Sequence, residues 1–297
     1  MKIKKDKIIK IYFFIIIGIA SIINADSFEN NSYNNHGTVG LINMPTARFY
    51  DEEVHGITFY DGTPDQKATL TASPYNWLEA SFFYTRNQNQ RYCELNYEFC
   101  EQTAKDKGFN IKLRLKEEGL LPAIAVGVYD IAGTGYYSSE YIVGSYGINK
   151  FDFHFGLAWG LLNGSDTKIK NPLGIFNDQF YSRPTGGSGY GGTFQPERYF
   201  SDKKISPFFG LSYAAGKKLL LKIEYDTTLT PGNIGYEIPK QDYSFGVEYK
   251  INNNFTIGVS SERGNYSSLR LVYKNNPKTS VKKYEYKKAD TNENDNK

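Results

Sequence analysis

The chain has 297 residues, among them 28 Gly, 25 Tyr and 20 Phe, but only three His and two Cys. This length suits one large domain or two small ones, and a single β-barrel can use all of it. The high aromatic and Gly content excludes a disordered chain, and three scattered His argue against a metal site with several His ligands. Beyond the N-terminus no apolar run is long enough for a membrane helix. The chain is therefore soluble or a transmembrane β-barrel, whose strands are short and half polar.

The N-terminus has the order of regions that defines a secretory signal peptide. Five lysines in the first ten residues precede an apolar run of 13 residues over 11–23, and Ala25 supplies the small residue of a cleavage site. A single N-terminal membrane anchor is the alternative, although 13 residues are few for a span. No Cys follows the apolar run, so the residues do not favour a lipid-modified N-terminus. We predict a cleaved signal peptide over 1–25 and export.

Export also changes the charge balance of the chain. The whole sequence carries 35 Lys and Arg against 32 Asp and Glu, and loss of residues 1–25, with five Lys and one Asp, leaves 30 against 31. The basic surplus therefore belongs to the signal peptide. Nothing in this balance favours nucleic acid as a partner, and we expect none.

Cys93 and Cys100 are the only cysteines, and export places them in an oxidising compartment. They belong to a polar stretch over 87–108 that we predict to be a loop. We expect a disulfide that closes this loop and stabilises the fold by roughly 2–3 kcal/mol. A metal pair is the alternative, but no His lies nearby.

From residue 54 onward, apolar and polar residues alternate with a period of two. In 151–161 every odd position is large and apolar, and the even positions are Asp, His, Gly and Ala. A strand separates such residues onto two faces, whereas a helix scatters them. The segment Ser139–Tyr146 fits either register. The twelve predicted strands are Val54–Tyr60, Lys67–Ser73, Leu78–Arg86, Phe109–Lys116, Ala123–Asp130, Ser139–Tyr146, Phe151–Leu161, Pro207–Tyr213, Leu219–Asp226, Asp242–Lys250, Phe255–Glu262 and Tyr266–Lys274.

The links between these segments alternate between short ones and mostly longer ones. Five links have four to six residues. Between them lie a link of six residues over 61–66, four longer links and a tight turn over 263–265. Short periplasmic turns and longer external loops are typical of an outer-membrane barrel with an even strand number. We predict an all-β, antiparallel up-and-down transmembrane barrel of about 12 strands over 54–274. A disordered polar tail is expected over 275–297.

The contents of the two strand faces favour a membrane. The apolar faces are large and aromatic, and a closed barrel pairs every backbone group that would otherwise face lipid. A soluble β-sandwich or periplasmic barrel with a dry apolar core is the alternative. We predict the outer membrane of a Gram-negative cell, with outer-membrane lipid around the barrel. Tyrosines near strand ends suit an interfacial girdle, and they are Tyr84, Tyr129, Tyr225, Tyr243, Tyr249 and Tyr273.

The polar faces place charges of both signs inside the predicted barrel. One interpretation is a salt-bridged lumen that stiffens the wall. The other is a polar conduit for a hydrated solute, in which Lys112, Arg114 and Lys116 form a basic ladder toward an anionic sugar polymer, and the two can coexist. The lumen candidates are Lys67, Glu79, Lys112, Arg114, Lys116, Asp152, His154, Lys222, Glu224, Asp226, Glu248, Lys250 and Arg270.

Residues 26–53 have no place in the strand count. We expect this segment to cap the periplasmic mouth or to enter the lumen as a small plug. The candidate plug residues are Leu41, Met44, Pro45 and Arg48.

No enzyme is predicted and no cofactor is expected. A barrel lipase needs a nucleophilic Ser bonded to a His at the lipid-facing wall. The alternation turns His154 inward with no Ser beside it on its strand, and no G-x-S-x-G is present. The Gly run over 185–193 lacks the following Lys-Ser/Thr of a phosphate loop and is expected to be a surface loop.

A series of stretches covers nearly all of the chain up to about residue 274. In order they are Gly40–Arg48, Pro74–Thr85, Lys105–Leu115, Leu121–Gly135, Ser138–Val143, Phe151–Gly160 and Leu221–Asp226. Together they resemble the YjbH family of outer-membrane proteins linked to exopolysaccharide biosynthesis and export. The resemblance implies a non-enzymatic β-barrel in polysaccharide secretion, with exopolysaccharide and other secretion proteins as partners and no catalytic residues to carry over.

Typical members of that family are far longer, with additional C-terminal sequence, so this chain resembles a single barrel unit. Two other functions stay open. One is a structural or assembly barrel of the outer membrane, and the other is a general porin-like channel for small solutes.

Overall fold

The computed structural model describes residues 31–63, 65–91, 102–186, 191–229 and 239–280. The strands within these residues are β1 (Val54–Asp61), β2 (Asp65–Tyr75), β3 (Leu78–Arg91), β4 (Thr103–Lys116), β5 (Ala123–Ile131), β6 (Ser139–Ile148), β7 (Phe151–Gly160), β8 (Ile169–Lys170), β9 (Lys204–Ala214), β10 (Leu219–Tyr225), β11 (Tyr243–Lys250), β12 (Phe255–Glu262) and β13 (Tyr266–Asn275). The short helices are η1 (Pro172–Ile175), η2 (Asp178–Tyr181), η4 (Pro196–Arg198) and α2 (Pro277–Ser280).

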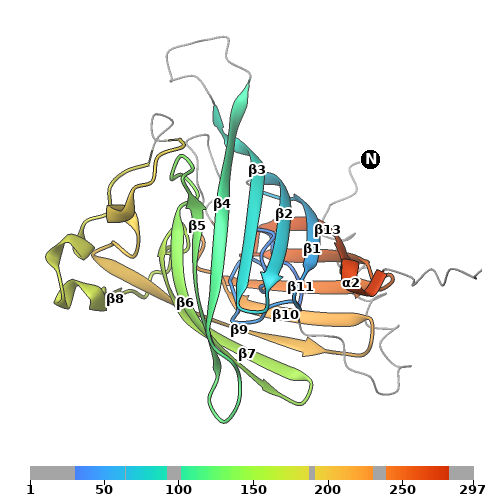
Figure 1. Ribbon diagram of the computed structural model, residues 1–297. Coiled ribbons are helices and arrows are strands. Elements are labelled where there is room, and N and C mark those ends of the chain that lie inside the picture. The colour runs from blue at the N-terminus through green and yellow to red at the C-terminus, as the bar shows by residue number, and fades with distance from the viewer. Residues whose placement is uncertain (1–30, 64, 92–101, 187–190, 230–238, 281–297) are drawn as a thin grey trace, which may run out of the picture.

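All of these strands except β8 form one closed antiparallel barrel (Figure 1). Each strand pairs with its neighbour along the chain, β7 pairs with β9 across the long link, and β1 pairs with β13 to close the ring. A closed ring leaves no barrel strand with a free edge, so the backbone groups of the wall are paired. The predicted 12-stranded up-and-down barrel is confirmed.

Each predicted segment overlaps one barrel strand, and β3 and β4 exceed the prediction the most, by five and six residues. β3 continues to Arg91 and β4 begins at Thr103, so both ends of the predicted loop over 87–108 are strand. This ribbon rises beyond its neighbours (Figure 1), where neither face has to be apolar and the alternation therefore gives no signal. Cys93 and Cys100 lie outside the described residues, and their disulfide stays a prediction. The signal peptide and the tail beyond 280 also lie outside them.

The outer wall of the barrel is apolar and its interior is polar. Phe151, Phe153 and Phe155 are 43%, 43% and 54% exposed, whereas Asp152 and His154 between them are 0% and 3% exposed. A barrel dissolved in water has the opposite arrangement, so this separation is the one that lipid requires. Among the described residues, no helix has the length and apolar character needed to span a membrane.

Two predicted outward positions are corrected by the structure. Tyr129 lies on the inner face, at 2% exposure, because it shares the parity of the buried Ala123 and Ala125 on β5. Trp159 has the outward parity of β7 but is buried, since the link to β9 folds over it and places Phe200 against its ring, 5.2 Å between centroids.

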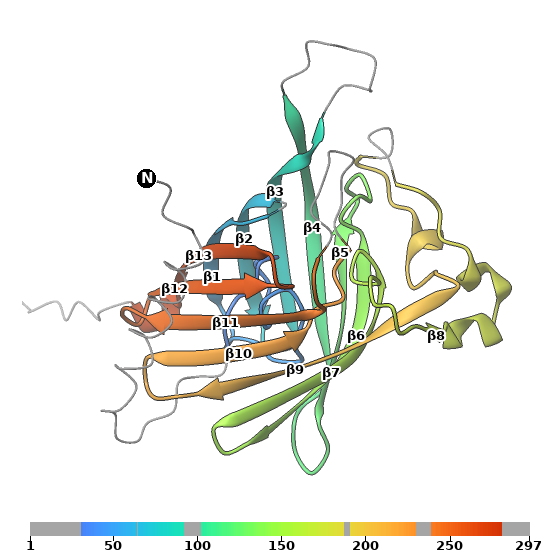
Figure 2. The same cartoon turned by 180° about the vertical axis from the view of Figure 1, so that it is seen from behind.

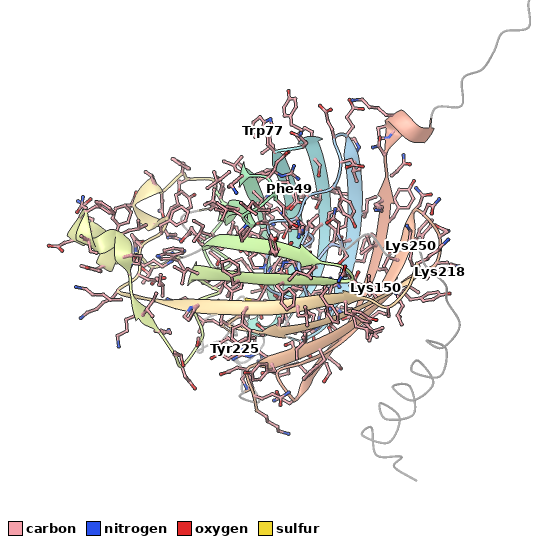
Figure 3. The ribbon with its side chains drawn as sticks, turned by 90° about the horizontal axis from the view of Figure 1, so that it is seen from below. Phe49, Trp77, Lys150, Lys218, Tyr225 and Lys250 are labelled. Atoms are coloured by element: carbon pink, nitrogen blue, oxygen red, sulfur yellow. The ribbon has the colours of Figure 1, made fainter. Side chains whose placement is uncertain are left out.

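The two ends of the barrel differ. The short turns, the start of β1 and the end of β13 share one end, where His55 pairs with Asn275. We call this end the inner mouth; in Figure 3, Lys150, Lys218 and Lys250 mark this end of the strands. The opposite end, which carries the longer links, is the outer mouth. Because the start of β1 and the end of β13 share the inner mouth, both ends of the described chain lie on the same side of the barrel.

The occupied lumen as the candidate functional site

Residues 31–50, which we call the luminal segment, lie inside the barrel and are nearly all buried. Asn31 and Arg48 lie at the inner mouth, while His36 lies toward the outer mouth, so the segment runs up into the lumen and returns before β1 begins. Its apolar side chains Leu41 and Met44 are 1% and 0% exposed. The lumen is therefore occupied by the protein's own chain.

The sequence of the luminal segment builds its compact shape locally. The side chain of Asn34 accepts hydrogen bonds from the backbone N–H groups of His36 (2.9 Å) and Thr38 (3.2 Å). Asn closes such turns readily, and Gly37 within the turn has a φ of +74°, which favours glycine. Isolated β-bridges join Tyr33 to Val39 and Gly40 to Pro45. The segment is thus a folded unit that the wall can hold.

One wall of the barrel holds the backbone of this unit through β10. The carboxylate of Glu224 accepts hydrogen bonds from three consecutive backbone N–H groups, from Ile42 to Met44, at 2.8–3.1 Å. Lys222, two residues earlier on the same face, donates to the carbonyls of the two residues that precede Ile42, at 3.0 and 2.7 Å. A buried carboxylate and a buried ammonium group are satisfied here by peptide groups.

A second pair does the same from β3 and β4. Glu79 accepts a hydrogen bond from the N–H of Val39 at 3.0 Å, and Lys112 donates to the carbonyls of Val39 (2.9 Å) and Arg48 (2.7 Å). The two charged groups are 3.4 Å apart. The wall thus recognises the luminal segment mostly through its backbone, by Lys and Glu side chains.

The inner mouth adds a charged contact. The guanidinium of Arg48 donates to both oxygens of Asp152, at 2.8 and 2.6 Å, and lies 2.5 Å from Glu118. Burial alone would lower the pKa of Arg48, but the hydrogen bonds and charges of Asp152 and Glu118 raise it above its ordinary value. Arg48 is therefore permanently charged and ties the returning end of the segment to β7 and to the β4–β5 turn.

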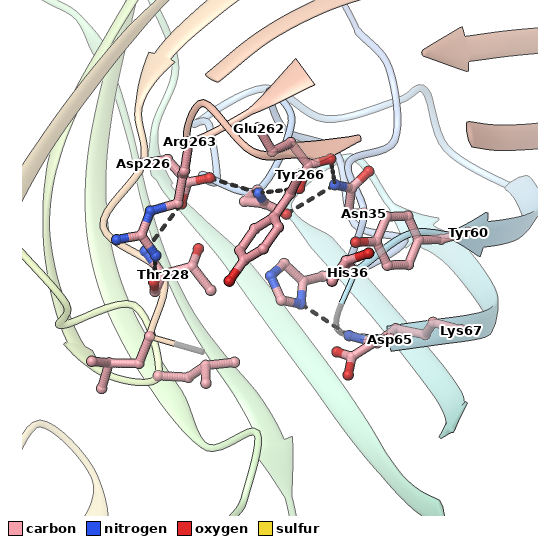
Figure 4. Close-up of a pocket in the computed structure, with 14 residues that line it drawn as sticks. Asn35, His36, Tyr60, Asp65, Lys67, Asp226, Thr228, Glu262, Arg263 and Tyr266 are labelled. Carbon is pink, nitrogen blue, oxygen red and sulfur yellow. Dashed lines mark hydrogen bonds between the residues drawn. The ribbon is translucent and has the colours of Figure 1, made fainter. Parts of the chain in front are cut away.

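The outer mouth has a small polar pocket above the segment (Figure 4). Asn35 donates to Glu262 (3.0 Å), and the ring of His36 accepts from Lys67 at 3.3 Å. Burial, and next the charge of Lys67, lower the pKa of His36 well below 6.5, so its ring is neutral at neutral pH. The pocket has a volume of about 40 Å³, which holds water but no sugar ring.

The structure buries most predicted lumen residues, and the three residues of the proposed basic ladder become more exposed toward the inner mouth. Of its three members only Lys112 points fully inward; Arg114 is 20% exposed at the inner mouth and pairs with Glu117 at 3.1 Å. The register with β5 shifts between Arg114 and Lys116, and the last ladder residue is partly exposed. The buried candidates are Lys67, Glu79, Lys112, Asp152, His154, Lys222, Glu224, Asp226, Glu248 and Arg270.

Sequence reasoning missed the partner of His154. Ser145 on β6 is its cross-strand neighbour, with 2.8 Å between the Ser Oγ and the His Nδ1. The same oxygen accepts the backbone N–H of Ala47 at 2.8 Å, and Asp152 lies 3.6 Å from the other ring nitrogen. This group thus also holds the luminal segment, and only the register between β6 and β7 reveals it.

Groups of three or more His, Cys, Asp or Glu suited to a metal ion are absent from the described part of the chain.

Over most of its length the chain is similar to a known protein family. The YjbH family, described as "Exopolysaccharide biosynthesis protein YbjH", matches residues 32–297. The "Uncharacterized lipoprotein YjbH" of Escherichia coli (strain K12) is 31% identical over 248 residues, which are 82% of this chain and 35% of that protein. The chain thus spans about a third of that relative.

Solved structures with similarity include two porins. A KdgM porin has a TM-score of 0.40 at 9% identity, covering 74% of this chain and 97% of that one. A NanC porin has a TM-score of 0.35 at 9% identity, with the same coverage. Scores of this size do not establish a shared fold.

Proposed function

Since this chain belongs to the YjbH family of exopolysaccharide biosynthesis proteins, we propose that it acts in exopolysaccharide secretion as an outer-membrane barrel closed by its own luminal segment. The polymer would pass when the segment leaves the lumen. The role is non-enzymatic. The chain itself would be exported by means of a cleaved signal peptide. Other secretion proteins would supply the polymer at the inner mouth.

The occupied lumen is the observation that carries this proposal. A segment held mainly through backbone groups can leave without breaking any strand pairing, because none of its contacts belongs to the barrel ladder. The wall left behind would carry Glu79, Lys112, Lys222 and Glu224, whose polar groups suit a hydrated chain of sugar hydroxyls. The luminal segment would thus be a removable plug.

Planar-bilayer recordings test the plug. A variant that lacks residues 37–50 should show a raised ion conductance relative to the full chain. A deletion of equal length within 281–297 is the control, because the last barrel strand, β13, ends at Asn275, and it should conduct like the full chain. Absence of conductance in all three proteins would contradict the channel.

A structural or assembly barrel is the second candidate, and the close filling of the lumen favours it. Deletion of the gene distinguishes the two functions. Loss of secreted polysaccharide with an intact permeability barrier supports secretion, whereas normal polysaccharide with a leaky membrane supports the structural role. If the protein were a general small-solute porin, deletion of the gene would instead slow solute uptake.

A further inference from the structure

We infer that the long link between β7 and β9 binds a phosphate-bearing lipid of the outer leaflet. The lateral loop, defined as residues 166–186 and 191–204, would hold the phosphate with lysines and the acyl chains with exposed apolar side chains. This inference requires the barrel to lie in a membrane and is independent of whether the lumen opens.

The position of the lateral loop suits a lipid. It joins two strands at the outer mouth, and β8 with the adjoining 3₁₀ helices stands out sideways from the wall in all three whole-molecule views (Figures 1, 2 and 3). A surface that projects sideways at this end of a membrane barrel lies over the surrounding lipid, away from the pore axis.

Lysines gather where β8 meets β9. Lys170 and Lys204 are directly paired across the two strands, and Lys168 and Lys203 are next to them. All four are exposed, and like charges placed opposite each other are destabilising. Within the described residues none of them has an ion pair, and Lys170 lies over the ring of Tyr181 at 4.7 Å. This cluster lacks the counter-charge that an anionic headgroup would supply.

Of the six other charged residues of the loop, Arg183, Arg198 and Asp202 are engaged inside it. Arg183 donates two hydrogen bonds to the buried Glu140, at 2.7 and 3.0 Å, and Arg198 donates to the carbonyl of Thr185 at 2.8 Å. Asp202 accepts the N–H of Gly160 at 2.8 Å. Over 166–204 the sequence has six basic and four acidic residues. Asp166, Asp178 and Glu197 are also exposed, but within the described residues none of them forms an ion pair with the four lysines.

The apolar half of the surface is next to the lysines in the chain. Ile175 and Phe176, at the end of η1, are 80% and 83% exposed, and Ile169 between two of the lysines is 44% exposed. Neighbouring exposed apolar side chains are costly in water and favourable in acyl chains. A soluble acidic polymer would satisfy the lysines but would leave these side chains in water, which is why we favour a lipid.

Lipid retention tests the lysines. The full chain in detergent micelles is mixed with lipid A, a diphosphorylated glycolipid, and the lipid that stays with affinity-captured protein is quantified by mass spectrometry. The combined variant Lys168→Ser, Lys170→Ser, Lys203→Ser and Lys204→Ser should lower the apparent affinity about tenfold or more. The control Lys150→Ser with Lys218→Ser, at the inner mouth, should bind like the parent.

Other outcomes overturn the inference. Equal retention by the lysine variant would do so, and so would phosphatidylcholine retained as well as lipid A. If millimolar inorganic phosphate alone displaced bound lipid A as well as free lipid A does, the lysines would form an anion site that does not recognise lipid. Heat-dependent gel migration of each variant verifies that its barrel has formed.

The apolar half has a separate test that needs no lysine change. Phe176→Trp is reconstituted into vesicles of phosphatidylcholine and lipid A with brominated acyl chains. The added Trp fluorescence, after subtraction of the parent chain with its two native Trp, should be quenched relative to unbrominated vesicles. Unquenched fluorescence would place the side chain in water and contradict the proposed surface.

Discussion

At the scale of single residues, buried charges hold a stretch of backbone in place. Glu224 and Glu79 accept peptide N–H groups, and Lys222 and Lys112 donate to peptide carbonyls. Buried charges are stable only when paired and hydrogen-bonded, so wall and luminal segment depend on one another. If one of these charged side chains is removed, its buried peptide partners lose a hydrogen bond that neither water nor another protein group replaces.

Glu224→Ala removes the acceptor of three backbone N–H groups from Ile42 to Met44. We expect the free energy of unfolding to fall by about 3 kcal/mol, because buried donors are left unpaired. Urea unfolding in lipid vesicles measures the change. Glu117→Ala, at an exposed position, is the control and should change it by less than about 0.5 kcal/mol; equal losses in both variants would refute the role of Glu224.

His36 makes part of the stability depend on pH. Burial, followed by the charge of Lys67, lowers its pKa well below 6.5, while an unfolded His titrates near its ordinary value. Below about pH 6.5 the unfolded state therefore binds a proton that the folded state does not, and stability decreases as the pH falls. Between pH 7.5 and 5.5, His36→Gln should lose less unfolding free energy than the parent. His55→Gln, at an exposed position, should keep the parent's loss, and an identical loss in all three proteins would count against this.

At the scale of elements, the luminal segment is a folded turn that fits one place in the wall. Its tip approaches β2 so closely that a Cβ on Gly37 would lie 2.3 Å from the Cβ of Thr69. The tip is therefore held both by the +74° backbone angle and by the lack of a side chain. Both constraints act on one small residue.

Gly37→Ala should unseat this turn. A side chain is strained at positive φ and has no room beside Thr69, so we expect a loss of about 2–3 kcal/mol in unfolding free energy and a raised conductance in bilayers. Gly119→Ala is the matched control, because nothing lies within 4 Å of its added Cβ. If both substitutions behave alike, the close approach at the tip does not hold the segment.

At the scale of the whole molecule, closure of the ring determines stability. The pairing of β1 with β13 joins the first and the last strand of the barrel, from His55 with Asn275 to Asp61 with Leu269. Without it, β1 and β13 would each present an unpaired edge to lipid, where no water can satisfy their peptide groups.

Removal of residues 266–297 deletes β13 and should abolish the barrel. On an unboiled gel the full chain should migrate differently from the boiled chain, and this variant should lose that difference. Removal of 281–297 alone is the control and should keep it, since it leaves β13, which ends at Asn275, in the chain. A heat-dependent band from the variant without β13 would show that closure by β13 is dispensable.

Much of the barrel could be predicted because its signals are local. Period-two alternation assigns each residue to a face from its neighbours alone, as with Phe153 between Asp152 and His154. The alternation failed where a second layer intervenes, as at Trp159, and where strands leave the core, as at Arg91. Both failures come from surroundings that are distant in the sequence.

The amino-acid sequence by itself determined the strands, the apolar exterior, the polar interior and the family. Only the tertiary structure decided which polar groups meet: Glu224 lies about 180 residues from the N–H groups it accepts, and Ser145 reaches His154 only through strand register. The reason is physical, since a face follows from the pleat of one strand, whereas a contact depends on closure of the whole ring and on what fills it.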